Sequence, residues 1–304
     1  MSEMKLYYNN ADIYKNISMN YCVHEMNAGK RSDSLTIKFN DVSSIWSVWS
    51  PDTSDIIRVK YGNTDSGDMY IHSVTSENGI FTLRALSVPP GNLEKKSRDW
   101  EKIRLTRLVA QIAEENGLSY QLHGVDEQVY SRIVQDNETD FAFLDRICEC
   151  ESCCFMIYDK TIVVYSEPYM ESRNAGTLEV GENGKFHYSK IYEKYKTCRV
   201  VNGKFSGEFS TDYGKGILNI TDLKPLSSSE AIRLSKAMLR KYNKDSVCGK
   251  ITKSIVDKYS AASVVNLKTV KASAWEKKMF ITSIRNNYLE NRSDIYFREC
   301  LEGY

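Results

Sequence analysis

The chain lacks any long apolar run and is poor in histidine. Its apolar residues occur in short stretches, and none approaches the roughly 20 consecutive apolar residues that a membrane-spanning helix needs. The first ten residues contain no apolar run followed by a small-residue cleavage site, so we expect no signal peptide and synthesis in a cytoplasm. The four histidines, His24, His72, His123 and His187, lie singly. Their spacing offers no catalytic triad.

Net charge is also small, at +1 over 304 residues, but it is uneven along the chain. Residues 1–91 carry −2, residues 92–170 carry −6 and residues 171–304 carry +9. Clustered Lys and Arg would indicate nucleic-acid binding. Here lysines such as Lys185 and Lys215 are spread among acidic and aromatic residues, so we favour a solvated or subunit-facing surface and expect no nucleic acid. Opposite charges on neighbouring segments suit subunits that dock around a ring.

Cysteine is plentiful, and half of the eight residues lie close together as Cys148, Cys150, Cys153 and Cys154. The spacing of Cys150 and Cys153 is shared by zinc knuckles and redox motifs. Structural zinc usually needs a second Cys or His pair, and a redox pair sits at the start of a helix, whereas this pair follows the end of one. We interpret these cysteines as packing residues in a reducing compartment and expect no metal and no cofactor.

Residues 1–91 have the pattern of β structure. Apolar and polar residues alternate at 34–39, 56–61, 69–72 and 80–86, between turn signals, which predicts a small antiparallel barrel or sandwich. Trp46 and Trp49 lie between two of these strands. They are compatible with a stacking platform for sugar or single-stranded nucleic acid. We favour a single turn that plugs the end of the barrel, because large aromatic side chains dominate core energetics.

Residues 92–170 predict a compact α/β module. Residues 104–116 have helical spacing of apolar residues, 118–122 have strand character, and 155–158 with 161–165 predict a hairpin. Asn137 or Thr139 can cap a second helix. The buried stripe of that helix is expected to contain Phe141, Leu144 and Ile147.

Three carboxylates stand at the start of this second helix. Asp136, Glu138 and Asp140 are compatible with paired groups for acid–base catalysis. Beside a helix N-terminus they more simply satisfy the helix dipole and its free N–H groups. We therefore name no catalytic, cofactor-binding or metal residue in this chain.

Residues 171–304 return to β structure with one helix. Residues 176–180, 197–203 and 216–220 are predicted strands of a second barrel. Ser227 and Glu230 have capping-box spacing and open a helix through about Tyr242. Further strands are expected at 248–253 and 262–267, and a closing hairpin at 279–285 and 294–300.

Two motifs carry a resemblance to a known family. Phe280–Arg285 followed by Asp294–Arg298 forms one pattern, and the other lies in the middle segment: Trp100, Gln135, Asn137, Glu138, Thr139, Asp140, Phe143 and Leu144. In this order they resemble the phage late control protein D family, the hub proteins of contractile-tail baseplates, which are similar to the N-terminal hub part of type VI spike proteins. The resemblance covers nearly the whole chain, and the first barrel departs most from it.

The resemblance implies an α+β, mainly β protein without enzymatic activity. It implies two tube-protein-like antiparallel β-barrel domains, at 1–91 and 171–304, joined by an inserted α/β module at 92–170. It also implies a homotrimeric ring in the tail baseplate of a virion or phage-tail-like particle, assembled in the bacterial cytoplasm. The implied partners are further copies of the chain, a spike protein, a tail tube or tube-initiator protein and other baseplate proteins. Because the chain ends at Tyr304 without a needle or hydrolase, we expect the spike and any wall-cutting activity on other chains.

Two other classes of function stay open. A tail-tip module that binds cell wall or glycan would use Trp46, Trp49 and the many tyrosines. A cell-wall hydrolase would need a nucleophile with a histidine, or paired carboxylates in a cleft. The sequence does not distinguish a phage from a bacteriocin or another contractile injector.

Overall fold

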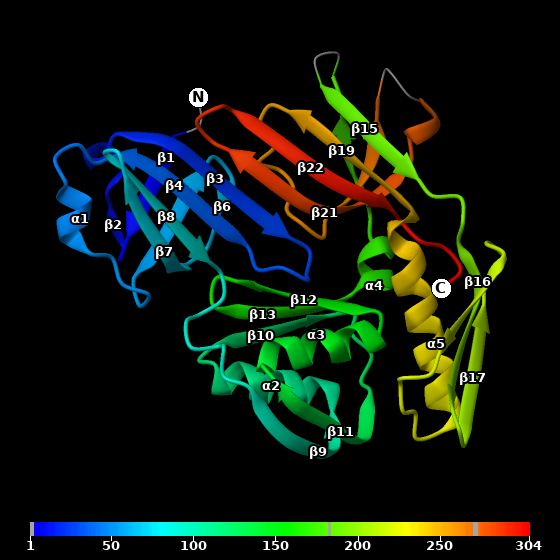
Figure 1. Ribbon diagram of the computed structural model, residues 1–304. Helices are drawn as coiled ribbons and strands as arrows, with labels where there is room; N and C mark the ends of the chain where they lie inside the picture. The colour runs from blue at the N-terminus through cyan, green and yellow to red at the C-terminus, as the bar shows by residue number, and fades with distance from the viewer. Residues whose placement is uncertain (1–2, 182–183, 270–272) are drawn as a thin grey trace.

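The computed structural model describes residues 3–181, 184–269 and 273–304, apart from the side chains of Ser47, Trp49 and Ser273. The protein is α+β and mainly β, as predicted. Two groups of strands lie side by side, an α/β module lies below them, and a long helix with a small sheet lies at one end (Figure 1). Among the described residues, no helix is both long and apolar enough to cross a membrane.

The first β unit contains the four predicted strands and four more. Alternation places every second side chain in its core, where Leu6, Leu35, Val59 and Leu83 are at most 1% exposed. The elements are β1 (Met4–Tyr8), β2 (Ala11–Asp12), η1 (Tyr14–Asn16), β3 (Met19–Asn27), β4 (Ser34–Asn40), α1 (Ile45–Trp49), β5 (Ile56–Tyr61), β6 (Thr64–Asp65), β7 (Met69–Glu77) and β8 (Ile80–Leu86).

The short helix α1 closes one end of this unit, as expected. Trp46 is buried, and its ring lies 4.3 Å from that of Phe39 and 6.2 Å from that of Phe81, measured between centroids. A stacking platform needs an exposed ring, so Trp46 is not available for one. The side chain of Trp49 lies outside the described part of the chain.

The module follows as β9 to α4. Its core joins both helices to the hairpin, and Leu108, Phe143 and Val164 are fully buried in it. The sequence did not indicate β9, which is rich in charge and pairs with β11 in a sheet of their own. The elements are β9 (Lys96–Arg104), α2 (Leu105–Glu115), β10 (Ser119–His123), β11 (Val129–Glu138), α3 (Asp140–Cys150), β12 (Cys153–Tyr158), β13 (Thr161–Ser166) and α4 (Glu167–Ser172).

The rest of the chain divides between two sheets. β14 (Gly176–Glu179), β15 (Lys185–Lys190), β19 (Val247–Lys253), β20 (Val264–Lys268), β21 (Lys278–Asn287) and β22 (Arg292–Glu299) form the second β unit. The remaining strands, β16 (Tyr195–Asn202), β17 (Phe205–Ser210) and β18 (Gly216–Ile220), form a separate three-stranded sheet against α5 (Ser228–Asn243). Two short 3-10 helices complete the fold, η2 (Lys244–Ser246) and η3 (Ser273–Trp275).

This division corrects the prediction that residues 197–203 and 216–220 belong to the second barrel. Both segments are strands, but their apolar side chains face α5: Cys198 and Val200 pack with Leu234 and Leu239. The helix α5 therefore covers the apolar face of these strands, and the second β unit does not.

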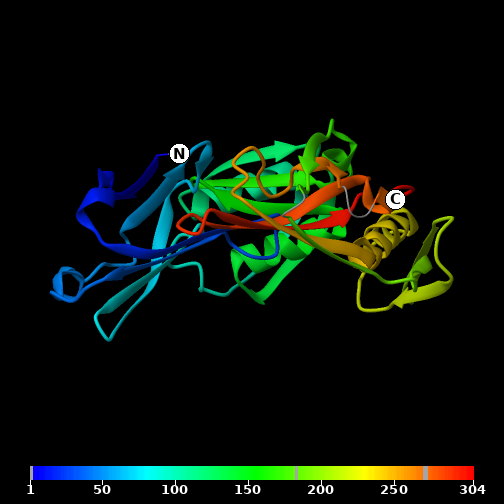
Figure 2. The same cartoon turned by 90° about the horizontal axis from the view of Figure 1, so that it is seen from above.

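The two β units share one sheet. β21 pairs with β3 in antiparallel register, with Arg285 opposite Glu25, and the resulting sheet has 14 strands. Figure 2 shows strands of the first unit (blue) meeting β21 and β22 (red) near the middle of the molecule. The seam contains buried polar groups: His24 Nδ1 lies 3.0 Å from the Tyr288 hydroxyl. Burial lowers the pKa of His24 to about 4, so this histidine is neutral in the folded protein at pH 7.

Close packing of β17 against α5 requires glycine at position 207. A Cβ there would lie 2.2 Å from the backbone nitrogen of Ile232. We predict that Gly207→Ala lowers the free energy of unfolding by about 1–3 kcal/mol, because α5 must move away from the sheet. Urea unfolding measures the change. Gly181→Ala is the control, since its Cβ would meet nothing within 4 Å; equal losses in both variants would contradict the prediction.

Candidate functional site

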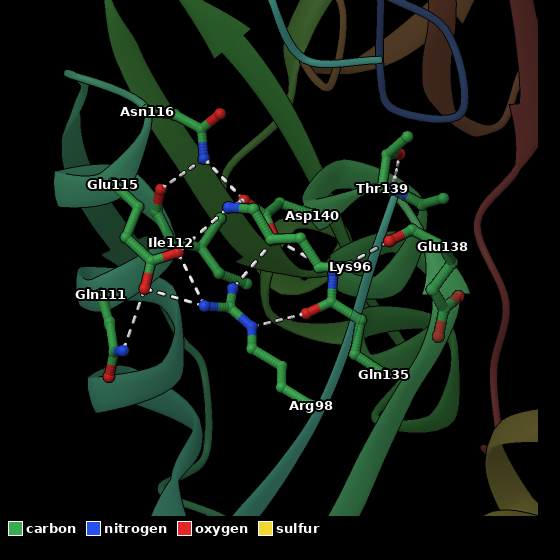
Figure 3. Close-up of polar contacts among 11 residues, drawn as sticks. Lys96, Arg98, Gln111, Ile112, Glu115, Asn116, Gln135, Glu138, Thr139 and Asp140 are labelled. Atoms are coloured by element: carbon green, nitrogen blue, oxygen red, sulfur yellow. Dashed lines mark hydrogen bonds and ion pairs between the residues drawn. The ribbon is translucent and has the colours of Figure 1, made fainter. Parts of the chain in front are cut away.

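Several residues of the middle-segment motif come together at the start of α3. Thr139 caps the helix: its hydroxyl accepts a hydrogen bond from the Ala142 N–H at 3.2 Å. The next residue, Asp140, is 5% exposed and lies between β9, β11 and α2 (Figure 3). The predicted cap is thus confirmed for Thr139.

Asp140 accepts contacts from four side chains. Lys96 Nζ lies 2.6 Å and Arg98 Nη2 2.9 Å from its carboxylate oxygens. Gln135 donates at 3.0 Å and Asn116 at 3.1 Å (Figure 3). Burial opposes ionisation of this carboxyl, but the hydrogen bonds from Lys96, Gln135 and Asn116 outweigh it and hold the pKa of Asp140 below its usual range.

Arg98 extends the cluster to the aromatic core. Its guanidinium donates to Gln135 at 2.8 Å and lies 4.3 Å from the centroid of the Trp100 ring. Trp100 in turn stacks on Phe143, with centroids 6.1 Å apart. Among the motif residues, Gln135 therefore contacts Asp140 and Trp100 contacts Phe143, and Arg98 links the two pairs, which fixes α3 against β9 and β11.

The three carboxylates do not form a catalytic pair. Asp140 is neutralised by Lys96 and Arg98, and Glu138 forms an ion pair with Arg146 at 2.5 Å. Asp136 is exposed. A general acid and base would have to face one substrate with different pKa values. Here the three carboxylates have different surroundings and do not face one substrate. The contacts of Asp140 and Glu138 instead hold α3 in position.

The four clustered cysteines are free and face the interior. Cys148, Cys153 and Cys154 are buried, and Cys150 is partly buried. Burial raises the pKa of Cys150 to about 11 and that of Cys154 to about 12, which disfavours the thiolate that metal binding and redox exchange need. Within the described residues, no group of three or more His, Cys, Asp or Glu side chains could hold a metal ion.

A second cluster was not foreseen from the sequence. Five charged residues, each at most 8% exposed, meet where α4, α5 and β22 come together: Glu167, Glu171, Arg240, Lys244 and Arg298. We call these five residues the charge junction. Both carboxylates of the junction lie on the short helix α4. The start of this helix is set by the Ser166 hydroxyl, which caps it, and by Pro168 in its first turn.

The charge junction is held by short contacts. Glu171 lies 2.6 Å from Arg240 and 2.5 Å from Arg298. Glu167 lies 2.8 Å from Lys244 and 3.3 Å from Arg298. Burial alone would raise the pKa of Glu167, but Arg298, Lys244 and Arg240 lower it to about 2. The carboxylate is therefore ionised across the physiological pH range.

Two further ion pairs join α5 to the module. Arg233 lies 3.1 Å from Glu151, and Lys241 lies 2.7 Å from Glu149. The basic residues of α5 recur at helical spacing in the sequence. This spacing is the sequence signal from which a charged face of the helix could have been predicted. Part of the opposite charge on the second and third segments is thus neutralised inside one chain.

Asp140 allows a direct test of the motif. We predict that Asp140→Asn lowers the free energy of unfolding by about 2–4 kcal/mol, because the contacts from Lys96 and Arg98 lose their charge assistance. Asp136→Asn, at an exposed position in the same motif, should change it by less than about 0.5 kcal/mol. Urea denaturation of both variants gives the comparison; similar losses would refute a special role for Asp140.

The charge junction predicts a pH dependence. The pKa of folded Glu167, about 2, is below its ordinary 4.5, so this group stabilises the fold above pH 4.5 and the contribution is lost as the pH falls toward 2. We predict that this group contributes about 3 kcal/mol to the acid destabilisation of the wild type, and that Glu167→Gln lacks this contribution because it has no carboxyl to protonate. Denaturant midpoints between pH 6 and about 2 measure it.

The matched control for this prediction is Glu208→Gln, which removes a carboxylate from an exposed ion pair with Arg199. Its acid dependence should equal that of the wild type, because exposed pairs contribute little. An unchanged slope in Glu167→Gln would show that the junction does not set acid stability.

No protein-family model and no curated protein matches the chain. Solved structures do match its fold. The 43 kDa tail protein of prophage MuSo2 from Shewanella oneidensis is similar over 98% of both chains, with a TM-score of 0.76 and 12% identity. The tail protein from Neisseria meningitidis MC58 is similar over 98% of this chain and 96% of that one, with a TM-score of 0.75 and 10% identity.

A third similar structure is the E. coli c3393 protein, described as a component of the type VI secretion system with structural similarity to the T4 bacteriophage tail proteins gp27 and gp5. The match covers 99% of this chain and 78% of that one, with a TM-score of 0.63 and 10% identity. At these identities the likeness concerns the fold alone. The chain therefore has a fold found in phage tail proteins and in a component of the type VI secretion system.

Proposed function

We propose that this protein is the structural hub of a contractile-tail baseplate, in a phage or phage-tail-like particle. It forms a homotrimeric ring between the tail tube, or a tube-initiator protein, and the central spike, and it contacts other baseplate proteins. Residues 1–91 supply the first barrel of each subunit, β14, β15 and β19 to β22 supply the second, and residues 92–170 supply the inserted module. The role is mechanical: the ring nucleates the tube and holds the spike without catalysing a reaction.

The observation that carries this proposal is the match of fold over 98% of both this chain and the MuSo2 tail protein. The shared sheet of 14 strands adds a physical argument, because it joins the two β units of one chain into one continuous β-sheet. Two such units per subunit let a threefold spike meet a sixfold tube, and closed cyclic association is the usual rule for homo-oligomers.

Exposed apolar side chains supply surface for such contacts. Val42 and Val48, beside and within α1, are 87% and 83% exposed, and Leu93, in the loop before β9, is 85% exposed. Among the described strands, the outer strand β15 is paired on one edge only, with β19. Free strand edges and exposed apolar groups are typical of surfaces that another subunit covers.

The proposal predicts a trimer in solution. Light scattering on the purified chain over a concentration series should approach three times the monomer mass, because a closed ring resists further growth. Electron microscopy of the same sample should then show rings. A monomer at every concentration would contradict the trimer; saturable peptidoglycan binding by that monomer would favour the tail-tip module, and turbidity loss of a peptidoglycan suspension would favour a hydrolase.

A further inference from the structure

A pocket of about 710 Å³ opens beside the charge junction. Its walls come from separate parts of the chain: α4, the segment after β15, the start of β21, and residues 299–302 and 304 after the body of β22. Its floor includes Glu171 and Arg240, which already neutralise each other at 2.6 Å. This size is in the range of pockets that bind small ligands.

The lysines around the pocket are not fully neutralised. Lys277 is paired with Glu299 at 2.8 Å. In contrast, neither Lys194 nor Lys278 lies within salt-bridge distance of a carboxylate in the described part of the chain. Both are half-buried, and only Glu302 adds another carboxylate to the lining. Burial lowers the pKa of Lys194, and Lys190 and Lys277 lower it further, although Glu299 opposes them.

Apolar and aromatic groups stand beside these charges. Pro168 and Leu301 line the pocket, together with Tyr213 and Tyr304. The Tyr304 hydroxyl is held by Asn243, whose Nδ2 donates to it at 2.7 Å. Tyr213 is 53% exposed and stands at the rim. Tyrosine side chains are enriched in surfaces that bind other proteins.

We propose that this pocket binds an acidic peptide segment of another protein, with two carboxylates reaching Lys194 and Lys278 and its apolar side chains against Tyr213 and Leu301. Charge complementarity selects this occupant, because Lys194 and Lys278 have no carboxylate within salt-bridge distance in the described part of the chain and would gain charge-assisted hydrogen bonds from those of the peptide. The inference adds a partner site to the proposed hub and rests on that function only for the source of the segment.

The probe is a fluorescein-labelled hexaglutamate peptide, measured by fluorescence anisotropy with the full chain at low salt. We expect saturable binding, and affinity at least about tenfold weaker in the double variant Lys194→Gln/Lys278→Gln, since two charge-assisted contacts are lost. The control Lys185→Gln/Lys224→Gln removes the same charge at exposed positions outside the pocket lining and should bind like the wild type. Thermal unfolding checks that all variants are folded.

Three outcomes would overturn the inference: no binding to the wild type, equal loss in both double variants, or equal binding of hexalysine. Tighter binding of a 20-base-pair DNA duplex, lost in the same pocket variant, would assign the site to nucleic acid instead. Light scattering on the same samples reports the subunit assembly, so a failed peptide titration and a failed trimer are separate results.

Discussion

The charge junction is the interaction on which the arrangement of this protein depends. Three cations and two carboxylates leave water together where α4, α5 and β22 meet, and each is at most 8% exposed. Such burial is costly unless every charge finds its partner, so none of the three elements can move away without exposing an unpaired buried charge. The module, the helix with its small sheet and the second β unit therefore hold one relative position.

Two other contacts extend this constraint. The cluster around Asp140 fixes α3 within the module, and the pairing of β3 with β21 joins the first β unit to the second. The first uses charge-assisted hydrogen bonds, and the second uses the backbone bonds of a sheet. Together these contacts join the module and the two β units through one polypeptide.

Much of the local structure was predictable because it depends on nearby residues. Alternation located β4, β5 and β8, apolar spacing located α2 and α3, and capping residues set the starts of α3 and α5 at Thr139 and Ser227. The hairpin of β12 and β13 follows from its turn. Alternation alone does not choose the partner of a strand, which explains why β16 and β18 were assigned to the barrel although they pack on α5.

The sequence by itself determined the class of fold, most of its elements and the residues of the middle motif. Only the tertiary structure decided that β3 pairs with β21, that Lys96 and Arg98 neutralise Asp140, and that Arg240 of α5 faces Glu167 and Glu171. The reason is distance along the chain: His24 and Tyr288, for example, are 264 residues apart. Contacts of that kind leave no periodic pattern, because packing and not local propensity brings the partners together.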